Sequence, residues 1–211
     1  MTIHSGQELR EAYQHRTWEY YRPVLAALVE FLPPGVILDV GAGTGLFVEC
    51  CARLGLSCVG LEGALEGVAM AQARGIRLVA GRLELGLPFR DASFAAIVCN
   101  QVIEHLHDAT ADLVLRESHR VLVPGGVLMI QSPSPHDPEQ RREPGHINLY
   151  TPSRVGAAAR RRIQRGGPRV VPVPSGAHDR HRPFPRRDYC GGGAATVKDG
   201  VIAVPELARS R

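Results

Sequence analysis

Residues 36–47 read VILDVGAGTGLF and combine one acidic residue with three glycines. Asp39 ends an apolar run, and Gly41, Gly43 and Gly45 follow at every second position. Glycines in such a turn let the backbone take positive φ angles and let a ligand lie directly against it. A strand that ends in a glycine turn and leads into a helix is typical of nucleotide-binding α/β proteins. The segment therefore predicts a nucleotide-like ligand at the carboxyl end of a first strand.

The spacing of the glycines separates two classes of nucleotide ligand. A dinucleotide fingerprint reads G-x-G-x-x-G, and its third glycine packs the helix on the strand. Here Leu46 stands in that third place, so a nicotinamide-dependent dehydrogenase is the less favoured alternative. Glu62 ends a second apolar run, where its carboxylate could accept hydrogen bonds from both hydroxyls of a ribose. The alternative for Glu62 is a helix-capping or surface acid.

A histidine-rich segment follows the fourth apolar run, with Glu104-His105 and then His107-Asp108. We expect no metal site there, because the later ligands of a metal-binding histidine cluster are missing from this stretch. His105 could act as a general base, since a histidine pKa lies near neutrality. The alternative is a structural His105 that its neighbours hold at the start of the helix.

The elements that must position these residues alternate between strand and helix. A helical segment, 9–31, comes first and ends at Pro33-Pro34. Alternation of this kind predicts an α/β fold with a doubly wound, mainly parallel sheet. The predicted strands cover 36–39, 57–61, 76–80, 93–100 and 127–131, and the predicted helices cover 46–54, 64–73 and 108–122.

The first helical segment carries aromatic residues at helical spacing, among them Trp18, Tyr20 and Tyr21. Such residues usually pack a helix onto the sheet. The alternative is that some of these rings cover the ligand site as a lid. Both interpretations make residues 1–34 an N-terminal helical cap.

Five segments, in order along the chain, resemble the motifs of class I S-adenosylmethionine (SAM) methyltransferases. The glycine turn resembles their first motif, and VGLEGA resembles their ribose-binding motif. GRLELGLPF, FAAIVCNQVIEHLHD and RVLVPGGVLMIQSP resemble the adenine loop, the fourth-strand motif and the turn with the fifth strand. The resemblance implies a Rossmann-like fold, SAM as cofactor, and a small-molecule methyl acceptor as in the ubiquinone-type group.

The resemblance also implies roles for particular residues. The three glycines pass under SAM, Asp39 steers its amino acid portion, and Glu62 holds the ribose. In the segment GHINLYT, His146 would face the acceptor as a second candidate base beside His105. The remaining implied SAM contacts are Leu83 and Glu84 at the adenine, and Asn100 and Gln101 at the methionine part.

Charge is divided unevenly along the chain. Residues 1–153 hold 12 Arg against 17 Asp plus Glu, whereas residues 154–211 hold 13 Lys plus Arg against 4 acidic residues. We therefore divide the chain into the cap, a SAM-binding domain at 35–153 and a basic, irregular tail at 154–211, in which the apolar runs 170–173 and 201–204 could be strands. A nucleic-acid partner is expected only through this tail. An inactive SAM-binding or partner-binding module with an RNA-binding tail is the alternative function.

Two compositional features concern the compartment. No run of about 18 apolar residues occurs, and the N-terminal ten residues are polar, so we expect no membrane span and a cytoplasmic location. The five cysteines form no C-x-x-C pair. We expect them to be reduced, with no disulfide or metal role. Oligomeric state is not encoded in any pattern of this sequence.

Overall fold

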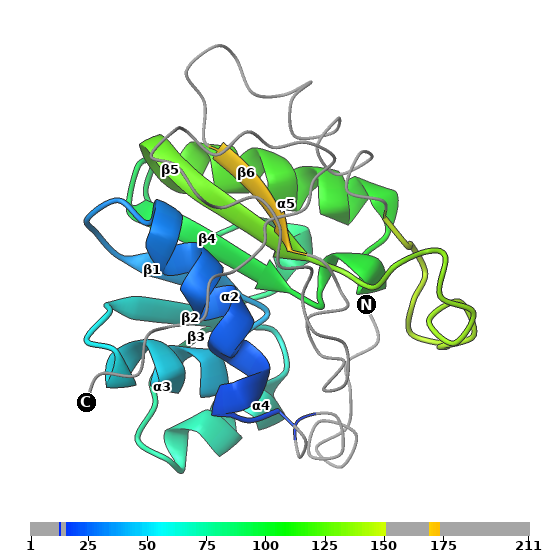
Figure 1. The fold of residues 1–211 in the computed structure, drawn as a ribbon, viewed down its shortest axis with the longest axis horizontal. Helices are drawn as coiled ribbons and strands as arrows, with labels where there is room; N and C mark the ends of the chain where they lie inside the picture. The colour runs from blue at the N-terminus through cyan, green and yellow to red at the C-terminus, as the bar shows by residue number, and fades with distance from the viewer. Residues whose placement is uncertain (1–12, 14–15, 151–168, 174–211) are drawn as a thin grey trace, which may run out of the picture.

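The computed structural model describes residues 13, 16–150 and 169–173 (Figure 1). Strands and helices alternate along the chain, as the sequence predicts. The elements are α2 (Trp18–Phe31), β1 (Ile37–Val40), α3 (Leu46–Arg53), β2 (Cys58–Glu62), α4 (Leu65–Gln72), β3 (Leu78–Ala80), η1 (Leu83–Leu85), β4 (Phe94–Asn100), η2 (Ile103–His105), α5 (Asp108–Val121), β5 (Leu122–Gln131) and β6 (Arg169–Val173).

The strands form one sheet in the order β3-β2-β1-β4-β5-β6, and every pair is parallel. The chain runs outward from β1 to β3 and then returns to β4 on the other side of β1. At such a reversal the connections after β1 and β4 leave in opposite directions, which opens a crevice at the carboxyl ends of the strands. The predicted doubly wound Rossmann-like fold is confirmed, and the glycine turn after β1 lies at this crevice.

Side chains of the central strands alternate between two apolar clusters, one on each face of the sheet. In β1, Ile37 joins a cluster with α2 and α3, whereas Leu38 and Val40 join a second cluster with α5 and η1. The same alternation holds in β4 and β5. Burial on both faces explains why these strands read as unbroken apolar runs in the sequence.

The structure differs from the sequence prediction at the start of β5. The run Pro124-Gly125-Gly126 was expected to be a turn before the strand, but β5 begins at Leu122 and includes it. The pairing with β4 shifts register between Phe94 and Ala96, and Gly125 has a φ of 75°. A bulged strand can accommodate these residues because glycine tolerates that backbone conformation.

The basic tail contributes one described element. Residues 169–173 form β6, which pairs in parallel with β5, so the apolar run at 170–173 is confirmed as a strand. The rest of the predicted irregular tail, including 201–204 and Cys190, lies outside the described residues. Within those residues Cys50, Cys51, Cys58 and Cys99 are free thiols, as expected. None of the described helices is long and apolar enough to cross a membrane.

One arginine holds the loop before β4 against α5. Arg120 donates to the backbone oxygens of Leu87 and Phe89 at 2.9 and 2.8 Å, to Asp91 Oδ1 at 2.7 Å, and to both carboxylate oxygens of Glu117. The pKa of Glu117 is lowered by its hydrogen bonds with Arg120. Since planar, charge-assisted hydrogen bonds are the stronger ones, this contact orders the loop that follows β3.

Replacing Arg120 by alanine should therefore lower the free energy of unfolding by about 1–2 kcal/mol, since the side chain is partly exposed to solvent. Urea unfolding followed by circular dichroism measures the change. Arg116→Ala is the matched control, because Arg116 is exposed on the same helix and should change stability little. Equal losses in both variants would show that the loop does not depend on the Arg120 contacts.

Candidate functional site

The glycine turn connects β1 to α3 in a conformation that suits glycine. Gly41, Gly43 and Gly45 have φ values of 74°, 56° and 77°. The backbone N–H groups of Gly41 and Ala42 both donate to the Leu61 carbonyl, at 2.9 and 3.0 Å. Two neighbouring strand ends, β1 and β2, are thus joined at the crevice.

Glu62 is buried at the end of β2 and accepts hydrogen bonds from two backbone N–H groups, one after β1 and one after β2. Its Oε2 accepts a hydrogen bond from Gly43 N at 2.6 Å, and its Oε1 accepts one from Ala64 N at 2.7 Å. Each carboxylate oxygen can accept a second hydrogen bond. The geometry thus contains the helix-start contact that was the alternative interpretation and still leaves acceptor capacity for the predicted ribose contact.

Asp39 is 4% exposed and lies on the sheet face covered by α2. Burial raises the pKa of its carboxyl to about 7, with a further rise from the charge of Glu62 and an opposing effect from Arg16. Desolvation disfavours the charged form of a buried carboxyl. An added positive charge at the crevice would therefore favour the ionised form.

This raised pKa predicts a pH dependence of stability. The folded protein binds the Asp39 proton more tightly than the unfolded chain does, whose aspartate pKa is near 3.9. The resulting stability is fully present below about pH 4 and is lost as the pH rises through 7, by about 2 kcal/mol between pH 5 and 8. In urea unfolding, Asp39→Asn should flatten this fall. Glu30 is exposed, so the control Glu30→Gln should show the same change of unfolding free energy with pH as wild type. If Asp39→Asn also shows the wild-type pH dependence, the prediction is wrong.

Residues of the N-terminal segment lie directly over the glycine turn. The Tyr13 ring contacts Gly43 so closely that a Cβ at position 43 would overlap it. The Arg16 guanidinium carbon lies 4.2 Å from the centre of the Tyr13 ring and 5.3 Å from that of Tyr20, which is cation–π geometry. Burial raises the pKa of Tyr13 to about 12. Tyr13, Arg16 and Tyr20 together form what we term the N-terminal cover.

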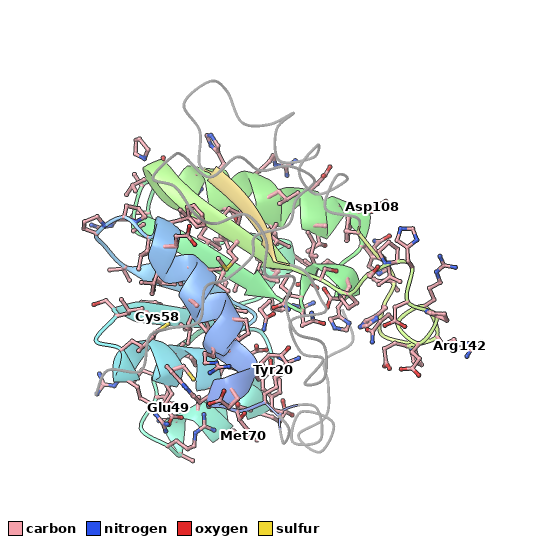
Figure 2. The ribbon with its side chains drawn as sticks, viewed as in Figure 1. Tyr20, Glu49, Cys58, Met70, Asp108 and Arg142 are labelled. Carbon is pink, nitrogen blue, oxygen red and sulfur yellow. The ribbon has the colours of Figure 1, made fainter. Side chains whose placement is uncertain are left out.

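The aromatic residues of α2 pack against the core. Tyr21 is buried and packs edge-to-face on Phe47 of α3 at 5.4 Å, and Trp18 and Tyr20 pack partly buried against the same cluster. Tyr20 also contacts Tyr21 at 4.8 Å and lies 5.3 Å from the Arg16 guanidinium carbon. A lid role for these rings stays a prediction. Figure 2 shows Tyr20 on α2 in front of the sheet.

The end of β4 brings polar groups to the same crevice. Asn100 is 5% exposed, and although Tyr20 approaches it, neither of its amide atoms has a hydrogen bond of normal geometry within the described residues. The next residue, Gln101, has a φ of 56° and donates its N–H to Gln131 O at 2.8 Å. Residues other than glycine seldom adopt left-handed backbone angles. Those that do are concentrated at functional sites.

The two predicted adenine contacts lie in η1. Leu83 is 3% exposed and belongs to the same apolar cluster as Leu61, so it is a core residue and not part of a surface turn. Glu84 Oε2 lies 3.6 Å from Arg82 Nε and has no hydrogen bond within the described residues. Arg82, the residue before η1, thus pairs with Glu84. Whether these residues contact adenine stays a prediction.

The structure brings His105 and His146 together, although they are far apart in the sequence. Their ring centroids are 5.0 Å apart. Fully buried Glu104 joins them, and one ligand-type atom from each of the three residues lies within 4.8 Å of the other two. Burial raises the pKa of Glu104 to about 7, while Ser132 and Arg16 act to lower it. The catalytic role predicted for the two histidines stays a prediction.

Sequence reasoning missed Tyr13 and Arg16 as residues of this site, and it noted Glu104 only as a neighbour of His105. Arg16 is three residues after Tyr13 and four before Tyr20, the spacing that places side chains on one helical face. A single charge among aromatic residues was the available signal. The sequence did not indicate that Glu104 is buried beside His146, because the loop that carries His146 comes back to η2 only in the folded chain, where Asn148 N donates to Glu104 O.

Comparison with known proteins identifies the domain that contains this crevice. Residues 38–130 match the family model described as a methyltransferase domain, from β1 to β5. This segment is a methyltransferase domain. Its glycine turn, the acid ending β2 and the β4 end follow in the order that the sequence resemblance implied.

Among similar curated proteins, "Probable tRNA methyltransferase 9B" of Bos taurus is 31% identical over 140 residues, covering 60% of this chain and 30% of the relative. "Ubiquinone biosynthesis O-methyltransferase" of Xanthomonas oryzae pv. oryzae is 34% identical over 103 residues, covering 46% of this chain and 42% of the relative. The chain thus spans less than half the length of these relatives.

Among solved structures, a SAM-dependent methyltransferase from Archaeoglobus fulgidus superimposes with a TM-score of 0.62 at 17% identity, over 72% of this chain and 71% of that one. At this identity the likeness concerns the fold alone. It agrees with the parallel sheet described above and supports the Rossmann-like class.

SAM is the cofactor of this methyltransferase domain, and the residues at the crevice fit it. Among the residues that the structure describes, none makes a hydrogen bond of normal geometry with the buried Asn100 amide, so this amide can bind a polar ligand. The carboxyls of Asp39 and Glu62 and the guanidinium of Arg16 offer partners for the ammonium, ribose and carboxylate groups of SAM. When bound, SAM supplies a methyl group already activated on a sulfonium.

Proposed function

We propose that this protein transfers a methyl group from SAM to an oxygen atom of a small-molecule acceptor. The proposal rests mainly on one observation: the side chains of His105, His146 and Glu104 lie close together beside the glycine turn. The segment that bears Glu104 and His105 touches the turn directly: a Cβ on Gly41 would meet Val102 Cγ2 at 2.5 Å. A proton acceptor is thus available within the crevice that takes SAM.

The proposed roles follow from the contacts. Glu62 holds the ribose, since its two oxygens are fixed by Gly43 and Ala64. Arg16 binds the carboxylate of the amino acid portion and Asp39 its ammonium group. The backbone around Asn100 and Gln101 lines the methionine part, and η1 lies at the adenine end.

His105 is the preferred base for the acceptor hydroxyl. Its Nδ1 lies 2.8 Å from the Gly145 carbonyl, which can only accept a hydrogen bond, so the proton is held on Nδ1 and the lone pair is on Nε2. His146 is oriented in the same way by Gln140 O at 3.0 Å. Neutral imidazoles with a fixed lone pair are suited to remove a hydroxyl proton near pH 7.

A small molecule is favoured over tRNA by charge. Residues 1–153, which form the crevice, carry an excess of acidic residues that would repel a phosphate backbone. The similarity to ubiquinone O-methyltransferases points the same way, whereas that to tRNA methyltransferases points to the alternative. A nucleic-acid partner through the basic segment 154–211 is therefore the second candidate.

The proposal is tested by incubating the purified full chain with methyl-labelled SAM. One reaction contains a pool of phenols, catechols and hydroxy acids, and the other contains total tRNA. We expect label in the small-molecule fraction and not in acid-precipitated tRNA. His105→Ala should lower the rate by about 100-fold, in the range of a lost general base.

His107→Ala is the matched control, because His107 is exposed and its side chain makes no capping hydrogen bond at the start of α5. Label on tRNA would overturn the small-molecule proposal. SAM binding in calorimetry without transfer to either pool would favour the inactive-module alternative. A cytoplasmic location also stays a prediction.

A further inference from the structure

We propose that Arg74, just after α4, and Gly67 within α4 are positioning residues for SAM, because they hold the glycine turn in place. Arg74 Nη2 donates a hydrogen bond to the backbone oxygen of Thr44 at 2.6 Å. Thr44 stands between Gly43 and Gly45 and is 4% exposed. The inference rests on the contact between this turn and SAM that the family resemblance implies, and it does not depend on the acceptor.

The peptide between Thr44 and Gly45 has a partner at each end. A trans peptide holds its C=O and its N–H on opposite sides of the chain. The C=O accepts a hydrogen bond from Arg74, and the N–H of Gly45 donates to the Ala42 carbonyl at 2.8 Å. Gly45 has a φ of 77°, and glycine adopts either sign of φ at little cost. The backbone of Gly45 alone therefore fixes this peptide weakly, and the Arg74 contact selects its orientation.

Arg74 is itself oriented by an acid from the helix that follows the turn. Its Nε lies 3.6 Å from Glu49 Oε2, and Glu49 Oε1 accepts a hydrogen bond from Arg53 Nη2 at 2.6 Å. Glu49 lies in the first turn of α3. Figure 2 shows Glu49 on α3 and Met70 on α4, the helix that precedes Arg74. Because a guanidinium has several donors in one plane, Arg74 can contact Thr44 and Glu49 at once.

Helix α4 packs directly on the same turn. Gly67 is buried, and a Cβ there would lie 2.7 Å from the Gly43 carbonyl oxygen. A Cβ on Gly45 would lie 3.2 Å from that of Ala71. Since a real Cβ atom essentially never comes within 3.0 Å of such a neighbour, a side chain at position 67 would push α4 and the turn apart. The turn is therefore supported twice, by close packing at Gly67 and by the hydrogen bond of Arg74.

A change in this support would alter the cofactor site. Gly43 N donates to Glu62 Oε2 at 2.6 Å, so the turn and the proposed ribose acceptor are linked. A binding site must be held within about 0.5 Å of its productive geometry. Without Arg74, the buried Thr44 carbonyl loses its charged partner, and the peptide can turn to find another. Part of the free energy of SAM binding must then restore the turn, so the observed affinity falls.

The test measures SAM binding by calorimetry on the purified full chain, without an acceptor. Arg74→Met keeps the apolar stem of the side chain but removes its donors. We expect it to raise the dissociation constant for SAM about 10-fold, through the loss of one charged, partly exposed hydrogen bond. Arg74→Lys should stay within about threefold of wild type, because the charge and a donor remain. Gly67→Ala should weaken binding at least about 10-fold, although alanine favours a helix more than glycine does.

Arg77→Met is the matched control, because Arg77 is an exposed arginine between α4 and β3 and should bind SAM as wild type does. Urea unfolding checks that each variant folds; should Gly67→Ala fail to fold, the two Arg74 variants decide the question. The proposal is overturned by an Arg74→Met constant within a factor of about two of wild type, by equal weakening in Arg74→Lys or Arg77→Met, or by wild-type affinity in folded Gly67→Ala. The absence of SAM binding in wild type overturns it too, whereas a chain that binds SAM but transfers no methyl group contradicts only the proposed function.

Discussion

Glu62→Gln is expected to weaken SAM binding by about 100-fold and to lower the free energy of unfolding by about 3 kcal/mol. A glutamine has a single acceptor oxygen, so its NH₂ group would face one of the two backbone donors that now bind Glu62, Gly43 N or Ala64 N. Burying two donors against each other costs the hydrogen bond and leaves both unsatisfied. The ribose would also lose its charged acceptor.

Calorimetry with SAM and urea unfolding measure the two effects separately. Glu66→Gln is the matched control, because Glu66 is an exposed acid in the first turn of α4 and should change neither value. A variant that loses stability but binds SAM as wild type does would assign Glu62 to the helix-start role alone. The alternative left open by the sequence is thus decided by one pair of measurements.

Arg16→Leu should raise the dissociation constant for SAM by about 30-fold to 1,000-fold, the cost of truncating one member of a largely buried charge pair. Arg16 lowers the pKa of both Asp39 and Glu104. Its loss therefore removes a partner for the SAM carboxylate and also favours the neutral form of Asp39. The weakening should be larger at pH 6 than at pH 8, because Asp39 is then more fully protonated.

Arg22→Leu is the control, since Arg22 is 55% exposed on α2 and pairs with the exposed Glu19 at 3.3 Å. Its binding constant should stay near that of wild type. An Arg16→Leu constant within a factor of about three of wild type would remove Arg16 from the SAM site. Arg16→Lys should recover part of the affinity, because the charge is kept while the planar fork is lost.

The N-terminal cover and the histidine cluster meet at the same crevice from opposite sides. Tyr13 and Arg16 approach the glycine turn from before β1, whereas His146 approaches η2 from after β5. Under the proposed function, the acceptor would reach SAM between these two segments, and Tyr13, Arg16 and His146 all lie outside the matched region 38–130.

The sequence by itself determined the sheet, the glycine turn and the class of cofactor. Local patterns were sufficient, because apolar runs buried on both faces give parallel strands, and the positive φ angles of the turn select glycine. The acid that ends β2 could likewise be found from its place on a strand end.

Only the tertiary structure decided what surrounds that turn. Glu104 and His146 meet because the loop at 143–150 returns to η2 through Asn148, and Arg16 reaches Asp39 because α2 packs on the face that bears it. Such contacts depend on chain segments far apart in sequence, whose approach no local period records. Burial then sets the chemistry: the same carboxyl that would ionise near pH 4 in an exposed chain has a pKa of about 7 at Asp39.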